Sequence, residues 1–287
     1  METAIFAFCL VCATQLGAQT KDGIYELDKE CAISQTGTIK LNSSDAKVTV
    51  TGSSRSTAHV KIFRQVTNKG IVFGSEEFGI DVSEDNGNLQ IRERSRSTVV
   101  GMVGYSYEKY TIDLEVPIGV SLYVRGDDGD YVIKNIGGSI SLDLDDADVE
   151  LVGCTGDDFR FRLDDGDILM DQGRGSLDVD ADDADVKISN ANFTSVVARV
   201  DDGDFTLETS LANGGDYQIT AQDGMVALTI TGGGGKFGIR HGDSRVTTAG
   251  DFQQESRSEN RTSLVLASGN AQVDIRVDDA RVRLVKR

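Results

Sequence analysis

The chain has 287 residues, 39% of them hydrophobic, with 32 glycines, one proline, no tryptophan and a formal net charge of −18. This acidic balance argues against nucleic acid as a partner, since such binding depends on basic contacts to phosphate, and against direct adhesion to anionic lipid. The length allows one elongated domain or two compact ones, and no Pro-rich or Ser-rich linker divides the chain. We therefore predict one domain, over residues 22–287.

The N-terminal segment, METAIFAFCLVCATQLGAQ, has an apolar run from Ala4 to Ala13 and ends in small residues around Gly17-Ala18. This pattern is typical of a signal peptide cleaved after Ala18, although it lacks a basic start, which leaves open a start further upstream. The run is too short for a membrane anchor, which needs about 20 apolar residues. We predict a signal peptide over residues 1–18 and an exported protein, whether periplasmic, outer-surface or secreted.

Two cysteines, Cys31 and Cys154, remain after this segment is removed. A disulfide between them is permitted in an exported protein. Cysteines so far apart in a stacked array are more often unpaired, so we predict two free thiols. Residues before Ile39 lack any repeat register and are expected to fray or to cap the first repeat.

The middle of the chain carries the same four-residue acidic turn, Asp-Asp-Gly/Ala-Asp, five times. Its first aspartates are Asp127, Asp145, Asp164, Asp182 and Asp201, so the spacing alternates between 18 and 19. The third position of the turn alternates between Gly and Ala. Apolar residues alternate with polar ones on both sides of each turn, so each repeat holds two strands with one buried face. A fixed period of this kind indicates units that bury their apolar side only by stacking on their neighbours.

Two all-β architectures fit this pattern. In a parallel β-solenoid, right-handed and β-helix-like, each repeat is one rung, and equivalent strands stack about 4.8 Å apart. In an antiparallel meander, each acidic turn would instead close a hairpin, making Leu163 and Ile168 cross-strand neighbours. Alanine in alternate turns argues against the meander, because such a hairpin needs positive φ there. In-register identity also favours the single-domain solenoid, in which a full turn could span one repeat or two.

The repeat is most regular over residues 120–210 and continues more faintly outside them. The expected outer turns are Ser44–Lys47, Gln222–Met225, Gly242–Arg245, Gly269–Gln272 and Asp278–Arg281. The polar run at residues 253–262 is expected to be a loop that leaves the stack, and residues 92–107 are expected to form a second loop with a mobile, partly apolar tip.

One segment carries a family resemblance. Residues 110–136 read YTIDLEVPIGVSLYVRGDDGDYVIKNI, a strand, then a Val-Pro-x-Gly step at Val116–Gly119, then Gly-Asp turns between Val/Ile/Leu strands. This resembles the "putative adhesin" family of bacterial exported β-strand-repeat proteins, a domain of unknown function, from about residue 35 to the C-terminus. The resemblance implies a β-solenoid, export and a surface or binding role, without catalytic residues to transfer. The Asp-Asp-Gly/Ala-Asp turn departs from the family's usual Ser-Gly-Asp by being more acidic.

The acidic turns are also candidate metal ligands. Residues 127–204 hold 22 acidic and six basic residues, a net charge of −16. Stacked rungs would align these carboxylates, and Ca²⁺ takes about six to eight oxygen ligands. The candidate Ca²⁺ ligands are Asp128, Asp130, Asp146, Asp148, Asp165, Asp167, Asp183, Asp185, Asp202 and Asp204. The alternative is that Asp simply forms turns well and that salt screens the exposed ladder.

An enzyme is the less favoured interpretation. Acid–base hydrolysis needs two carboxylates in unlike environments, whereas a regular ladder offers like ones. The two histidines, His59 and His241, lie far apart in the repeat order, and His241 is expected in the core; Tyr105, Tyr107 and Tyr110 could stack on a sugar. We predict a non-catalytic exported binding or structural protein, an adhesin-like solenoid with an acidic surface. A Ca²⁺-binding repeat protein and a β-helical polysaccharide-acting enzyme are the alternatives, and the partner could be a protein, a glycan or another copy.

Overall fold

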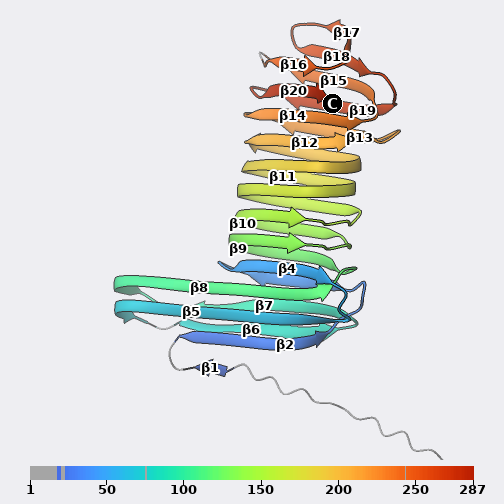
Figure 1. Ribbon diagram of the computed structural model, residues 1–287. Coiled ribbons are helices and arrows are strands. Elements are labelled where there is room, and N and C mark those ends of the chain that lie inside the picture. Colours follow the sequence, from blue (N-terminus) through green and yellow to red (C-terminus); the bar gives the residue numbers. More distant parts are fainter. Residues whose placement is uncertain (1–17, 21–22, 75, 243) are drawn as a thin grey trace, which may run out of the picture.

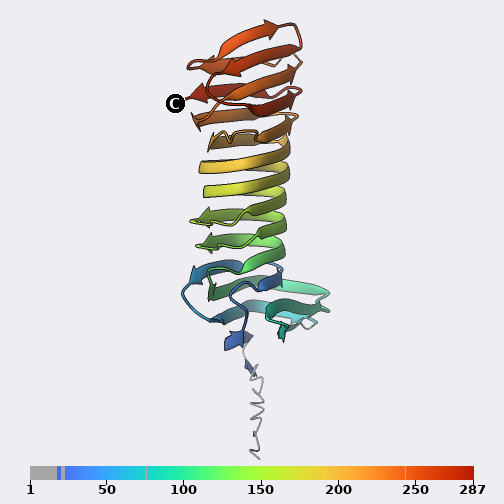
Figure 2. The ribbon, with the colours of Figure 1, turned by 90° about the vertical axis from the view of Figure 1, so that its right-hand side faces the viewer.

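A computed structural model describes residues 18–20, 23–74, 76–242 and 244–287. The described chain forms 20 strands, β1 to β20, which belong to one hydrogen-bonded sheet system, and it contains no helix. Figure 1 shows these strands stacked as the rungs of an elongated column, with β5 and β8 reaching beyond the column at its N-terminal end. Figure 2 shows the same stack from the side. Residues 1–17 of the predicted signal peptide lie outside the described residues.

The central rungs confirm the parallel β-solenoid. They are formed by β9 (Ser121–Lys134), β10 (Ile140–Val152), β11 (Asp158–Asp202) and β12 (Asp204–Ser210). Ile140 pairs in parallel with Leu122 on one side and with Phe159 on the other, and each partner lies one repeat away along the chain. A full turn of the solenoid is therefore one repeat, not two. The meander is excluded, because the two flanks of each acidic turn stack on the next rung instead of on each other.

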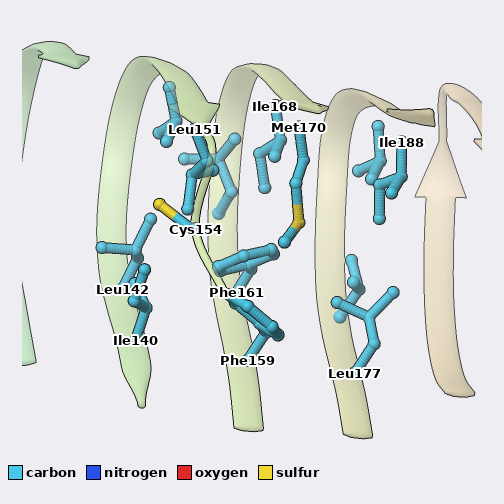
Figure 3. Packing of buried hydrophobic residues seen from close by; sticks show 14 of the residues in the cluster. Ile140, Leu142, Leu151, Cys154, Phe159, Phe161, Ile168, Met170, Leu177 and Ile188 are labelled. Carbon is cyan, nitrogen blue, oxygen red and sulfur yellow. The ribbon is translucent and has the colours of Figure 1, made fainter. Parts of the chain in front are cut away.

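The core runs along the axis between the two strands of each rung. Period-two alternation turns every second side chain inward, and those side chains lie above their equivalents in the next rung. Figure 3 shows this packing: Leu142 and Phe161 come from strands before the acidic turn and face Leu151 and Met170 from strands after it. All four are at most 2% exposed. Burying each such side chain stabilises the fold by about 1.5–3 kcal/mol, which each rung obtains only with neighbours in place.

The first rung in sequence is not the first rung in space. It consists of β3 (Thr38–Ser43) and β4 (Lys47–Ser53), joined by the expected turn at Ser44–Lys47. On one side, β3 and β4 pair in parallel with the two halves of β9. On the other side, β3 pairs with β7 (Asn88–Ser97) and β4 pairs with β8 (Gly101–Pro117). The first rung is thus held between two later parts of the chain.

Antiparallel strands close the N-terminal end of the column. Outside β8 the order is β5 (Thr57–Phe73), then β2 (Ile24–Ala32), then β1 (Ala18–Thr20), each antiparallel to the strand before it. Outside β7 lies β6 (Glu76–Asp85), also antiparallel. The predicted loop over residues 92–107 is wrong, since β7 and β8 occupy nearly all of it. The sequence suggested a loop because its strands bury no apolar face there. Residues before Ile39 do form a cap, as β2.

The C-terminal end repeats this arrangement. After β13 (Asp216–Ala221) and β14 (Met225–Gly232), the next rung in space is the last in sequence, β19 (Ala271–Val277) with β20 (Arg281–Lys286). Beyond it lie β15 (Gly235–His241) and β16 (Val246–Ala249). A hairpin of β17 (Gln253–Arg257) and β18 (Arg261–Leu266) then covers β15 in antiparallel orientation.

Two expectations for this region need correction. Residues 253–262 are not a loop leaving the stack, because most of them form this covering hairpin. The expected turn at Gly269–Gln272 is not an acidic-type corner, since it leads from the hairpin into β19. The corner of the last rung lies at Asp278–Arg281, as expected, between β19 and β20. Apolar alternation alone could not distinguish a stacked strand from one that returns antiparallel.

The alternation of Gly and Ala in the acidic turns follows from how the turns stack. Ala147 and Ala184 are at most 2% exposed and point inward at the corner. Gly166 has φ +107° and Gly203 has φ +147°, a region that side chains disfavour. A Cβ on Gly166 would lie 2.3 Å from the carbonyl oxygen of Ala147, and one on Gly203 would lie 2.4 Å from that of Ala184. Each glycine turn therefore packs tightly on the alanine turn of the rung before.

We predict that Gly166→Ala lowers the free energy of unfolding by about 2 kcal/mol or more, because it combines strain at positive φ with a backbone contact. The matched control, Ala147→Gly, should cost about 1 kcal/mol through lost burial and added backbone freedom. Urea unfolding of the two variants checks this. Equal losses in both would contradict the proposed origin of the alternation.

Both remaining cysteines are free and buried, Cys31 beneath β5 and Cys154 in the corner after β10. Removal from water raises the pKa of Cys31 to about 11 and also raises that of Cys154. Buried thiols of this kind react slowly, because the thiolate is the nucleophile. We expect iodoacetamide to label neither thiol in the folded protein at neutral pH and both in denaturant, by mass spectrometry without reduction. A two-proton mass deficit would reveal a disulfide and refute this expectation.

Candidate functional site

The five acidic turns from Asp127 to Asp204 stack in register along one edge of the solenoid, which we call the acidic edge. Asp146 pairs with Asp128 on one side and with Asp165 on the other. Of the ten candidate calcium ligands, nine are exposed and Asp204 is half-buried. The sequence therefore predicted the position of this ladder correctly. Its chemistry depends on what else the carboxylates contact.

Some of these carboxylates hold the backbone of the next turn. Asp148 Oδ1 accepts a hydrogen bond from the backbone N–H of Asp167 at 3.2 Å, and Asp185 Oδ1 accepts one from Asp204 at 2.7 Å. In both cases the acceptor belongs to an alanine turn and the donor directly follows the glycine of the next turn. Side-chain oxygens of Asp commonly satisfy turn N–H groups in this way. This structural role is enough to explain an aspartate at the fourth position of the alanine turns.

Other carboxylates of the edge repel one another. The pKa of Asp182 is raised above its ordinary value, first by loss of hydration and then by the charges of Asp201 and Asp164 on the neighbouring rungs. Like charges at equivalent positions are the direct consequence of stacking identical turns. The acidic edge therefore carries electrostatic repulsion that protons or cations would relieve.

The described residues contain no group of three or more His, Cys, Asp or Glu side chains arranged to hold a metal ion. Asp148 and Asp185 bond to backbone, and Asp130 lies 3.3 Å from the ammonium of Lys47. The edge thus aligns the ten predicted ligands in a row, but it does not bring three or more of them together around one metal position. Calcium binding stays a prediction.

A second surface, not anticipated from the sequence, projects beyond the acidic edge. β8 pairs with the first rung only from Thr111 onward, so its earlier residues and the paired half of β5 extend past the corner. We call residues 65–73 and 98–109 the arm; these parts of β5 and β8 pair antiparallel and reach out at the lower left of Figure 1, and the chain between them forms the hairpin of β6 and β7. Gly70 and Gly104 face each other halfway along it, with φ +139° and +136°. A Cβ on Gly70 would lie 2.0 Å from the Val103 carbonyl oxygen, so the two strands approach closely there.

The arm concentrates the exposed apolar surface of the protein. Of the eleven large hydrophobic side chains exposed among the described residues, eight lie on it: Ile71, Phe73, Val99, Val100, Met102, Val103, Tyr105 and Tyr107. The other three, Ile118, Tyr123 and Leu169, are scattered over the solenoid. Val100 is 88% exposed and Val103 68%. Isolated apolar side chains are normal on surfaces, but a gathered set of this kind marks an interaction site.

The root of the arm is fixed by a buried cation. The guanidinium of Arg64 pairs with Glu108 and, at 2.5 Å, with Glu76, so it links β5, β8 and β6. It also lies 4.2 Å from the ring centroid of Phe78, which packs edge-on against Tyr110. Tyr110 is only 4% exposed, so the suggested sugar contact is wrong for Tyr110, while Tyr105 and Tyr107 stay accessible. The arm is therefore anchored by ionic and aromatic contacts at its base.

The histidines lie as expected for structural residues. His241 is buried, and its Nε2 lies 2.9 Å from Thr262 Oγ1. His59 pairs with Asp28 at 2.7 Å in the N-terminal cap. They therefore occupy opposite ends of the column and cannot act on one substrate together. Within the described residues, no helix has the length and hydrophobicity to cross a membrane.

Comparison with known proteins identifies one family. Its sequence profile, Toastrack DUF4097, matches residues 36–284, in agreement with the resemblance drawn from residues 110–136. No curated protein matches the chain. Similar solved structures include a "putative adhesin" of Bacteroides fragilis (12% identity, 90% of this chain and 96% of that chain, TM-score 0.48) and a "putative lipid binding protein" of Parabacteroides distasonis (12%, 91% and 96%, 0.33). These values are too low to transfer any binding property.

We predict opposite effects for two aspartates of the acidic edge. Because the folded pKa of Asp182 lies above its unfolded value, the folded state binds this proton more tightly, and stability falls as pH rises through the carboxyl range. Asp182→Asn should therefore raise the melting temperature at pH 7 and reduce the gain seen on lowering pH toward 5. Asp185→Ala should lower it, since the Asp204 N–H loses its acceptor. If Asp182→Asn also destabilises, repulsion along the edge is not significant.

Calcium binding predicts a distinct response to salt. Millimolar CaCl₂ should then raise the melting temperature well above the value in NaCl of equal ionic strength, because only a bound ion stabilises by mass action. Chelation with EDTA should reverse the shift. Equal effects of the two salts would show that the aspartate ladder is merely screened.

Proposed function

The chain belongs to the Toastrack DUF4097 family, and we propose that it is a non-catalytic, exported, adhesin-like binding protein that uses the arm as its contact surface. The observation that carries this proposal is the gathering of eight exposed apolar side chains on the two paired strand segments of the arm. Contacts in protein interfaces are dominated by such anchors, with tyrosine enriched among them. The solenoid serves as a rigid support that holds the arm out from the column.

The composition of the arm favours a protein partner. Beyond Gly70 and Gly104 in the strand pair, its exposed apolar side chains are mostly aliphatic, and aliphatic side chains bind other apolar surfaces by excluding water. A glycan would need aromatic platforms with hydrogen-bonding groups around them; only Tyr105 and Tyr107 offer such platforms. Lys69 lies 5.5 Å from the Tyr105 ring centroid and covers part of that face. A glycan and a second copy of the chain are the alternative occupants.

We propose that the acidic edge influences which partners bind and that it has no catalytic role. With a net charge of −16 over residues 127–204, it repels anionic surfaces and attracts cationic ones over a distance of about one Debye length. Hydrolysis of a polysaccharide needs an acid and a base of different pKa, and the acid is held protonated by burial. The ten aligned carboxylates are exposed apart from the half-buried Asp204. Export, as the N-terminal sequence predicts, would bring the arm into contact with partners outside the cytoplasm.

We expect the triple variant Val103→Ser, Tyr105→Ser, Tyr107→Ser to lose binding at least tenfold while keeping the melting temperature of the parent protein. The measurement is binding of the labelled mature protein to arrays of surface proteins and of glycans, with light scattering to detect self-association. Leu169→Ser is the matched control, because Leu169 is 50% exposed on the solenoid face and far from the arm. Equal loss in the control would show that general surface hydrophobicity, not the arm, is responsible.

The enzyme alternative has its own outcome in the same set of experiments. Turnover of any polysaccharide by the parent protein, abolished by a single Asp→Asn change in the acidic edge, would replace the proposal. If the triple variant of the arm still binds the partner but Asp→Asn variants of the acidic edge do not, the acidic edge is the contact surface instead of the arm.

A further inference from the structure

One row of outward side chains crosses the solenoid face formed by the strands that precede the acidic turns. In the central rungs this row alternates in charge: Asp143 stands between Arg125 and Arg162 as a register partner of each. The guanidinium of Arg125 bonds to the Asp143 carboxylate at 2.5 Å. By the same one-repeat offset the row continues through Asp180 to Arg199. Opposite charges on neighbouring strands stabilise a sheet, so this arrangement is the expected one.

The alternation stops near the C-terminal end of the column. Arg199 is followed by Thr220, and Thr220 by three arginines in succession, Arg276, Arg240 and Arg261. These three stand directly opposite one another on β19, β15 and β18, and all are exposed. Among the described residues none of them forms an ion pair, in contrast to Arg125 and Arg160 of the central rungs. Neighbouring strands are about 4.8 Å apart, so the three cations repel one another.

The arginine row lies between two hollows. One, of about 220 Å³, opens beside Gly238, and the other, of about 560 Å³, opens toward His241 and Asn260. Thr220 and all three arginines line both hollows. Gly238 creates the first hollow because its outward position carries no side chain. The site is thus concave, as binding sites for small groups are, and offers several N–H donors together with a hydroxyl.

Two carboxylates also belong to this lining. Asp274 lies over Gly238, where a Cβ would be 2.8 Å from its Oδ1, and accepts a hydrogen bond from the Gln272 amide at 3.1 Å. Asp278 borders the larger hollow. The three arginines therefore outnumber the acids, in a chain whose net charge is −18. A local excess of positive charge against that background attracts anions.

We propose that Arg276, Arg240 and Arg261 form a binding site for a phosphate or sulfate group, an activity separate from the arm. The planar guanidinium presents donors in a fork that matches the oxygens of these groups. Bound between neighbouring strands, one such group can accept from two guanidiniums and relieves the repulsion among the three. Thr220 supplies a further donor at the end of the row.

The test compares two arginines of the same row. Inorganic phosphate or sulfate at low millimolar concentration should raise the melting temperature of the parent protein by about 3 °C at tenfold excess over Kd, compared with chloride of equal ionic strength. Arg240→Gln should abolish this increment while leaving the ligand-free melting temperature unchanged or higher, because it removes the middle charge. Arg162→Gln, flanked by acids, should keep the full increment. Asp274→Asn should tighten phosphate binding several-fold, because it removes a negative charge from the lining.

Two results would overturn the proposal. One is a rise in the melting temperature of the parent protein that is no larger in phosphate than in chloride. The other is an undiminished rise in Arg240→Gln, which would show that phosphate acts only through the general stabilising effect of such salts. Calorimetric titration with phosphate provides the same comparison without heating. Vesicles containing phosphatidylglycerol then distinguish the source: co-sedimentation lost in Arg240→Gln assigns a lipid headgroup, and phosphate binding without co-sedimentation assigns a soluble ligand.

Discussion

Every rung of this solenoid must place its inward side chains directly above those of the rung before, because the parallel hydrogen-bond ladder allows no shift in register without turning the apolar face outward. This constraint determines the corners as well as the core. Since equivalent corners lie on top of one another, each turn has to leave space for the next. The Gly/Ala alternation provides this space, because each glycine packs on the backbone of the alanine turn before it. The carboxylates of Asp148 and Asp185 then accept hydrogen bonds from the backbone of the following turn.

Stacking also brings surface charges at equivalent positions close together, and the signs of these charges differ along the column. On the flat face, Arg125, Asp143 and Arg162 alternate, so stacking creates attraction. At the acidic edge the same operation brings like charges together, and loss of hydration followed by these charges raises the pKa of Asp182. The three successive arginines at the C-terminal end are the other exception. Functional hypotheses follow from these departures, because a stacked array that served stability alone would alternate charge throughout.

The repeat itself could be predicted from the sequence because its signals are local. Equal spacing of Asp127, Asp145 and Asp164, with period-two alternation around them, gives the rung length, the buried side chains and the position of the acidic edge. The arm and the antiparallel caps could not be predicted, since their strands neither follow the repeat nor bury a continuous apolar face. Residues 92–107 were assigned to a loop for this reason, although the apolar residues at alternate positions, Val103, Tyr105 and Tyr107, were a readable strand signal. The arginine row depends on β19 entering between earlier strands, which no local pattern reveals.

The position of the terminal rungs has a consequence for the time course of folding. β3 and β4 find their partners in β7, β8 and β9, and β13 and β14 find theirs in β19 and β20, so both ends of the column close through contacts between distant parts of the chain. A chain emerging from a ribosome or a translocation pore cannot complete the C-terminal end of the column until β19 and β20 have emerged. Stacking should therefore nucleate in the sequential rungs of β9 to β12, where the loops to be closed are shortest, and spread outward from there.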